Sequence, residues 1–242
     1  PEFIPKTLSV FFTNPSIRIG LRLSKDETIV RMPFEVRHMG SKYPIFSFDF
    51  TGAKRGVLPA SYDYLRLEGR MQYRLNLPPI GYSQLMLEGG KIFGKVPYLL
   101  LKLHEGNGTY FYDRYAFSCM NFYEFSSDAW ISFFYEHHFN GFLLGRVPLL
   151  KKLNWREVFV FKGVYGTLSA RNDGSLPNTK AVMLFPVGMS SVEHPYLETG
   201  FGIENIFRLL RVDCIWRLTH HRAVPGLSIP TFTVNFSLNL KF

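Results

Sequence analysis

Cysteine, charge and long apolar runs are all scarce in this sequence of 242 residues. Two cysteines cannot cross-link a chain of this length, which excludes a disulfide scaffold. No apolar run approaches the ~18 residues that a transmembrane helix needs, which excludes that class of membrane protein. The net charge is +9, yet the basic residues form no basic helix or aromatic-basic stripe, so no nucleic-acid partner is expected.

Aromatic residues are plentiful, with 24 Phe and 13 Tyr, and this excludes intrinsic disorder. The length suits one domain over residues 1–242. The chain begins Pro-Glu-Phe-Ile-Pro, without Met or signal peptide. We therefore expect a mature chain or a fragment of a longer protein.

The hydrophobic pattern has a period of two. In the last segment Phe232, Phe236 and Phe242 belong to an apolar set that alternates with polar residues. Within 62–77, Leu65 and Leu67 alternate with a charged set. Successive strand side chains point to opposite faces, so each such segment predicts a strand with one apolar and one polar face.

About twelve such strands can be placed along the chain. They cover 6–13, 16–24, 27–39, 44–54, 62–77, 80–93, 109–125, 127–142, 153–171, 194–207, 209–220 and 230–242. Residues 172–194 read as a surface loop.

Two all-β architectures bury one face of many strands. A soluble sandwich or barrel places the apolar face inside, whereas a transmembrane barrel turns it toward lipid around a polar lumen. Long strands, successive charges on the polar face and aromatic residues near strand ends (Tyr110–Tyr112) favour the membrane. The predicted fold is an antiparallel transmembrane β-barrel, with about 12 visible strands that can belong to a barrel of about 16. Further strands or a partner chain can complete the wall, since an open edge is costly in lipid.

Several ordered stretches add to this pattern. They include Gly-Ser-Lys-Tyr-Pro at 40–44, Tyr-Phe-Tyr-Asp-Arg-Tyr-Ala-Phe at 110–117, Tyr-Glu-His-His-Phe-Asn-Gly-Phe at 135–142, Pro-Leu-Leu-Lys-Lys-Leu at 148–153 and Gly-Ile-Glu-Asn-Ile-Phe at 202–207. From about residue 40 to 242, the chain resembles the C-terminal barrel of outer-membrane proteins from Bacteroidota called "carboxypeptidase-like regulatory domain-containing", a family of unknown function. The family is distantly similar to the surface-antigen superfamily of barrels, which includes BamA and TamA.

The resemblance implies an outer-membrane location in a Gram-negative cell and no enzymatic activity. Two features of these relatives are not seen here. The regulatory-like β-sandwich and upstream strands are not obvious in this sequence. The Val-Arg-Gly-Phe/Tyr loop motif is matched only in part, by Lys54-Arg55-Gly56-Val57. An insertase mechanism is therefore not carried over.

Candidate catalytic and metal-binding residues are few. His137-His138 and His220-His221 are adjacent pairs, which cannot chelate as pairs from a strand, and no Cys, Asp or Glu lies at a ligand spacing. Serines such as Ser118, Ser126, Ser127 and Ser132 stand in no nucleophile-elbow motif. We predict no metal, no cofactor and no enzyme, although a Ser/His pair within hydrogen-bond reach on one face would indicate a barrel hydrolase. Cys119 and Cys214 share the apolar parity of their segments, so lipid- or neighbour-facing thiols are expected.

Charged residues of the polar face are the candidate site. They are Arg66, Glu68, Arg70, Arg74, Arg156, Glu198, Glu204, Arg211, Asp213 and Arg217. In a low-dielectric lumen such charges must pair or be solvated, so they form a stiffening salt-bridge network or a selectivity lining. Because both signs interleave, we favour the structural role.

The sequence thus predicts an outer-membrane barrel that acts as scaffold or accessory in outer-membrane protein assembly, envelope biogenesis or transport. Its expected partners are outer-membrane lipid, lipopolysaccharide and other outer-membrane or periplasmic proteins in a complex. A passive, porin-like channel is the alternative, and a continuous water path would favour it. A plugged lumen would favour the scaffold.

Overall fold

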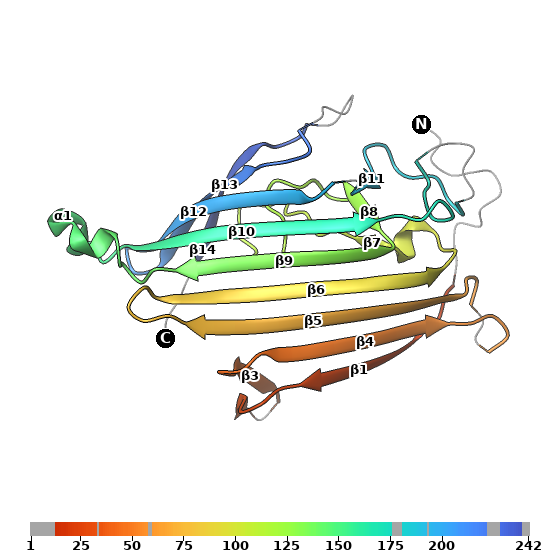
Figure 1. Ribbon diagram of the computed structural model, residues 1–242, viewed down its shortest axis with the longest axis horizontal. Helices are drawn as coiled ribbons and strands as arrows, with labels where there is room; N and C mark the ends of the chain where they lie inside the picture. The colour runs from red at the N-terminus through yellow and green to blue at the C-terminus, as the bar shows by residue number, and fades with distance from the viewer. Residues whose placement is uncertain are drawn as a thin grey trace.

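The computed structural model describes residues 13–32, 34–57, 60–175, 181–192, 194–221 and 228–238. Its main element is an antiparallel sheet of nine strands in the order β1-β4-β5-β6-β9-β10-β12-β13-β14 (Figure 1). The strands are β1 (Ile17–Leu23), β4 (Ile45–Ala53), β5 (Tyr64–Asn76), β6 (Tyr82–Gly94), β9 (Ala129–His138), β10 (Arg156–Thr167), β12 (Tyr196–Ile206), β13 (Leu210–Arg217) and β14 (Phe232–Leu238). The all-β, antiparallel prediction is confirmed.

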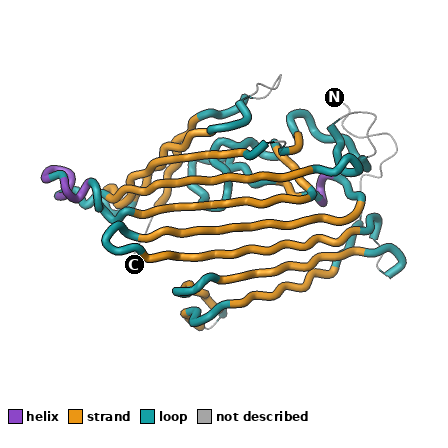
Figure 2. The backbone as a smooth tube through the Cα atoms, in the orientation of Figure 1, coloured by secondary structure: helices purple, strands orange, loops and turns teal. Residues whose placement is uncertain are grey.

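Smaller elements surround this sheet. β2 (Thr28–Arg31) and β3 (Val36–Gly40) form a hairpin, and β7 (Lys102–Leu103), β8 (Phe125–Ser127) and β11 (Ser190–Ser191) form a three-stranded sheet. The helical segments are short: Tyr98–Leu100, Leu144–Arg146 and α1 (Pro148–Lys151). Among the described residues no helix is long and apolar enough to cross a membrane. Figure 2 shows how little of the chain is helical.

The sheet is curved and open in the described part of the chain. β13 and β14 turn behind the plane of the central strands (Figure 1). β1 and β14 stand at the two ends of the strand order and do not pair with each other there, so no closed barrel is seen in the described residues.

Alternation of side chains explains why these segments pair as they do. Phe159 of β10 lies opposite Phe201 of β12, and Lys162 lies opposite Glu198 in the same pair of strands. A slip of one residue would move every side chain to the other face, so the hydrophobic pattern fixes the register. The predicted spans 44–54, 62–77, 80–93 and 209–220 agree with β4, β5, β6 and β13 to within three residues at either end.

Two predicted strands are wrong. Residues 27–39 form the β2–β3 hairpin, because the Met32 amide donates to the Glu35 carbonyl and reverses the chain. Residues 109–124 are not a strand of the sheet, because their apolar residues do not alternate and the Asp113 side chain accepts the Tyr115 amide in a local turn. Residues 6–12 and Phe242 lie outside the described residues, as does the rest of 239–242.

The hydrophobic core lies between the sheet and this irregular segment. Phe117 and Met120 of the segment pack with Met86, Phe134 and Val164 of the sheet. Their side chains are 5% exposed or less. The core is thus formed by one face of the sheet only, and the other face is left uncovered.

Candidate functional site

The two faces of the nine-stranded sheet differ in chemistry. One face, which we call the apolar face, carries large hydrophobic side chains that are between 37% and 65% exposed. They are Ile17, Ile19, Leu21, Leu23, Phe46, Phe48, Phe50, Leu65, Leu75, Phe93, Ile131, Tyr165, Phe201, Trp216, Phe232, Phe236 and Leu238. The opposite, polar face carries most of the charged side chains of the same strands, whereas Lys91 and Glu157 share the parity of the apolar face. Single exposed hydrophobics are ordinary, but a contiguous apolar face over nine strands marks an interaction surface.

A segment of the chain packs against the polar face. Residues 104–124, here called the inner loop, run along it between β7 and β8. The Lys162 ammonium donates to the carbonyls of Asp113 (2.7 Å) and Ala116 (2.6 Å). The Glu198 carboxylate accepts the amides of Ser118 (2.8 Å) and Cys119 (2.7 Å). Two opposite charges of the sheet therefore hold the backbone of one loop.

The inner loop is also attached to the edge strand β14. The Phe236 amide donates to the Tyr110 carbonyl, and the Tyr112 amide donates to the Phe236 carbonyl, both at 2.7 Å. The Asn235 amide group donates to the Thr109 carbonyl. Part of the β14 edge is thus satisfied by the loop. Tyr112 points to Glu136 on the polar face, whereas Tyr110 and Phe111 lie beside the β14 edge and are exposed, so the expected interfacial belt stays a prediction.

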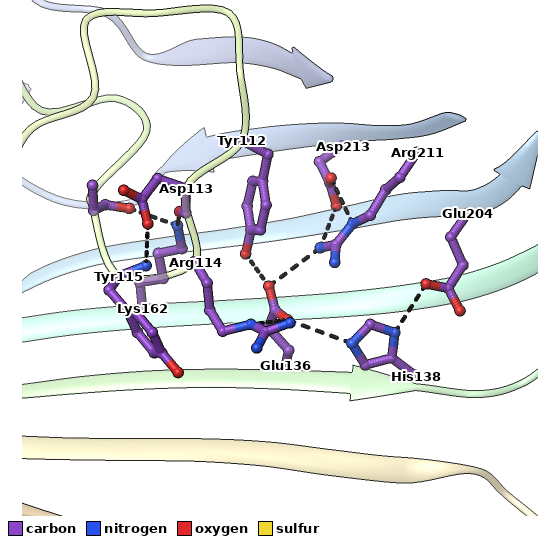
Figure 3. Close-up of polar contacts among 11 residues, drawn as sticks. Tyr112, Asp113, Arg114, Tyr115, Glu136, His138, Lys162, Glu204, Arg211 and Asp213 are labelled. Atoms are coloured by element: carbon purple, nitrogen blue, oxygen red, sulfur yellow. Dashed lines mark hydrogen bonds and ion pairs between the residues drawn. The ribbon is translucent and has the colours of Figure 1, made fainter. Parts of the chain in front are cut away.

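Glu136 is the centre of the main charge cluster (Figure 3). Its carboxylate lies 2.8 Å from the Arg114 Nε and 3.3 Å from an Arg211 terminal nitrogen, and it accepts the Tyr112 hydroxyl. Glu136 is 1% exposed. A buried carboxylate needs such partners, because desolvation otherwise penalises its charge. The cluster ties the inner loop, through Tyr112 and Arg114, to β9 and β13.

Two further pairs extend this cluster. Arg211 reaches Asp213 on its own strand at 2.7 Å, and His138 lies 3.1 Å from Glu204 and 3.4 Å from Glu136. Burial, followed by the Glu136 carboxylate, raises the pKa of Tyr112 well above its usual range. The hydroxyl of Tyr112 therefore stays protonated and remains a donor.

A second cluster holds the other end of the inner loop. Arg217 of β13 pairs with Glu124 at 2.5 Å and donates to the carbonyls of Cys119 and His220. The Tyr196 hydroxyl donates to Glu198 at 2.7 Å. Arg217 and Glu198 have exposed fractions of 3% and 0%. Both charges are thus committed to fixing the loop.

The remaining charges pair nearer the other edge of the sheet. Glu88 bridges Arg70 (2.6 Å) and Lys102 (2.8 Å), and Arg66 pairs with Glu68 at 2.7 Å. These pairs are independent of the Glu136 cluster. The sheet therefore carries several separate groups of paired charges.

The ten predicted charges all lie on the polar face, but they do not form one network. Arg211, Asp213 and Glu204 meet around Glu136, while Glu198 and Arg217 hold the inner loop. Arg66, Glu68 and Arg70 form the local pairs just described. Arg74 stacks over Tyr82 at 4.1 Å and lines a cavity together with Arg156.

Sequence reasoning missed the residues at the centres of these groups. They are Glu136, Lys162, Glu88, Glu124, Tyr112 and Arg114. For Glu136 and Lys162 a signal existed: each occupies the polar parity of its strand, between Phe134 and His138 and between Val160 and Val164. The loop residues gave no signal, because no strand pattern places them.

The described histidines and serines form no recognisable catalytic or metal site. No group of three or more His, Cys, Asp and Glu side chains that could hold a metal ion occurs within the described ranges. Two Ser–His pairs do exist: Ser83–His137 at 2.8 Å and Ser127–His104 at 2.9 Å. All four side chains are 6% exposed or less. No carboxylate hydrogen-bonds either imidazole in the described part of the chain, so the orienting third group of a triad is missing there.

The two cysteines lie in different environments, and only Cys214 belongs to a strand of the sheet as predicted. Cys214 of β13 lies on the apolar face. Cys119 lies in the inner loop, because Glu198 holds its amide and its thiol contacts the Ile215 carbonyl. Burial, and then the Glu198 carboxylate, raise the pKa of the Cys119 thiol to about 12.

This burial predicts that the Cys119 thiol reacts slowly with alkylating reagents. In a Cys214→Ser variant, folded Cys119 should react with N-ethylmaleimide at pH 8 about a thousandfold more slowly than the urea-unfolded chain, because the thiolate is the nucleophile. Mass spectrometry of quenched samples gives both rates. Equal rates in the folded and unfolded chains would show that the inner loop is not seated as described.

The fold and this face together define an all-β protein with a large antiparallel sheet, one exposed apolar face and a loop clamped on a charged face. Residues 15–170 match the C-terminal domain of the family of unknown function DUF5686, and this is more than half of the chain. The chain therefore belongs to that family, which confirms the prediction that it is a member of a family of unknown function. A search of the curated proteins found no match. Likeness to the BamA and TamA barrels stays a prediction.

Proposed function

We propose that this chain forms part of the wall of an integral β-barrel in the outer membrane of a Gram-negative cell. There it would act as a scaffold or accessory component in outer-membrane protein assembly, envelope biogenesis or transport. The observation that carries the proposal is the polarity of the sheet: large apolar side chains are exposed along all nine strands, whereas the opposite face buries charges such as Glu136, Lys162, Glu198 and Arg217. A soluble sheet would bury the apolar face and expose the charged one.

Strand length supports the same proposal. A tilted strand needs about 9–11 residues to cross a bilayer, and β5, β6, β9, β10 and β12 have between 10 and 13. The edge of β1, and the part of the β14 edge that the inner loop does not pair, would leave unpaired amides and carbonyls in hydrocarbon. We therefore propose that β1 and β14 are completed by further strands of the same protein or of a partner chain.

The inner loop favours a scaffold over a passive channel. It occupies the polar face through Lys162, Glu198 and Glu136, each of which is fully or almost fully buried. Charges paired in this way stiffen a lumen and are not free to select ions. The two Ser–His pairs are closed from solvent, so a hydrolase has less support than either alternative.

Purification of the tagged full-length protein from its own envelope tests the proposal. We expect the protein to require detergent and to retain stoichiometric outer-membrane or periplasmic proteins in mild detergent, identified by native mass spectrometry. A water-soluble monomer would contradict the membrane assignment. A lone, detergent-bound chain that conducts ions in planar bilayers would favour the channel function over the scaffold function.

A further inference from the structure

A cavity of about 770 Å³ lies at one end of the sheet. Its walls come from the ends of β5, β9, β12 and β14, the starts of β6, β10 and β13, and the inner loop. The short turns at residues 77–81 and 207–209 border this end, while the long connections 95–128 and 168–195 leave from the opposite end. This cavity is separate from the backbone clamps of Lys162 and Glu198.

The lining of this cavity carries an excess of positive charge. Five arginines line it, and Glu204 is its one acidic lining residue among those described. They are Arg74, Arg114, Arg156, Arg208 and Arg211. Arg114 and Arg211 pair with Glu136, and Arg211 also pairs with Asp213. Even when Glu136, Asp213 and Glu204 are all counted, five guanidinium groups face three carboxylates.

Arg74, Arg156 and Arg208 make no ion pair within the described part of the chain. Arg74 is held over the Tyr82 ring at 4.1 Å, and Tyr82 stacks on His138 at 4.5 Å. Arg156 lies opposite Glu204 in the β10–β12 ladder, but Glu204 is bound to His138. Within the described residues, these three cations therefore line one cavity without an ion pair of their own.

The cavity also reaches the apolar side of the sheet. Leu238, which is 62% exposed on the apolar face of β14, lines it together with Leu209 from the β12–β13 turn. An anionic group in this cavity can therefore be joined to an apolar tail that follows the outside of β14. This arrangement fits a lipid whose charged head enters the cavity.

We propose that this cavity is a binding site for a phosphate group, which Arg74, Arg156 and Arg208 recognise. Guanidinium groups match phosphate oxygens in charge and in paired N–H geometry, better than ammonium groups do. The phosphate belongs either to an anionic lipid headgroup or to a free phosphate compound. The lipid source rests on the membrane proposal, whereas the phosphate site itself does not.

Binding can be measured on the detergent-purified protein with two probes. Inorganic phosphate is titrated by calorimetry, and phosphatidylglycerol is compared with phosphatidylcholine by native mass spectrometry. The test variant carries Arg74→Gln, Arg156→Gln and Arg208→Gln. The matched control, Lys54→Gln, Lys95→Gln and Arg171→Gln, removes three exposed cations from the opposite end of the sheet.

We expect the triple arginine variant to lose at least about tenfold in affinity and the control to keep it, since hydrogen bonds to charged groups are the strong ones. Arg208→Gln alone changes an exposed turn residue, so it tests the site without disturbing packing. Selective phosphatidylglycerol binding that needs these arginines supports the lipid source, and binding of inorganic phosphate alone supports the free compound. Absence of binding to both probes, or equal affinity in the arginine variant, would overturn the proposal.

Discussion

Replacing Glu136 with Gln is expected to lower the free energy of unfolding by about 3 kcal/mol or more. The change leaves Arg114 without its carboxylate and removes one of the two carboxylates that neutralise Arg211. Arg211 is 3% exposed, so water cannot replace the carboxylate there, whereas the Arg114 side chain is 37% exposed and contributes less to the loss. Urea unfolding in detergent micelles, followed by tryptophan fluorescence, measures the loss.

Glu68→Gln is the matched control for this prediction. Its pair with Arg66 has side-chain exposures of 21% and 23%, and exposed pairs contribute at most about 1 kcal/mol. The account therefore predicts a clear difference between two identical substitutions on the same face of the sheet. Equal losses in both variants would contradict the central role of Glu136.

Replacing Lys162 with Met is expected to loosen the inner loop from the sheet. Met keeps most of the side-chain length, but the carbonyls of Asp113 and Ala116 lose their donor. Each unsatisfied buried group costs about 1–3 kcal/mol. The amides of Ser118 and Cys119, which now bond to Glu198, should exchange hydrogen at least about tenfold faster.

Hydrogen exchange with mass spectrometry of peptides from the inner loop measures this effect. Lys95→Met removes an exposed lysine and should leave the exchange unchanged. Peptides from β5 and β6 provide an internal reference, because they contact neither carbonyl. Unchanged exchange in the Lys162→Met loop peptides would show that the loop is held by apolar packing alone.

Much of the sheet could be predicted from the sequence, because a strand with two unlike faces has alternating apolar and polar residues in its own sequence. The alternation of Leu65 and Leu67 with Arg66 and Glu68 places β5, and the pattern around Trp216 places β13. The polar face was correct for the same reason. Lys162 was overlooked because its nearest neighbours in the middle of β10 are uncharged, although its parity is that of Glu198 across the ladder.

The inner loop could not be predicted, because its conformation is set by distant residues. Nothing near Cys119 in the sequence indicates that Glu198 will hold its amide or that Arg217 will bind its carbonyl. The grouping of charges around Glu136 likewise depends on the register of four strands and on the loop that brings Tyr112 and Arg114. Pair identities of this kind follow from topology, which single-sequence patterns do not contain.

The most direct test of the account is whether lipid touches the apolar face. Trp216 lies on that face and is 41% exposed, whereas Trp130 lies on the polar face and is 5% exposed. One variant, with Trp130→Phe and Trp155→Phe, keeps only Trp216, and a matched variant, with Trp155→Phe and Trp216→Phe, keeps only Trp130. Both are reconstituted into vesicles of lipids with brominated acyl chains, which quench only indole rings that they contact. The account predicts strong quenching of Trp216 and little quenching of Trp130; equal quenching of the two, or none of Trp216, would contradict it.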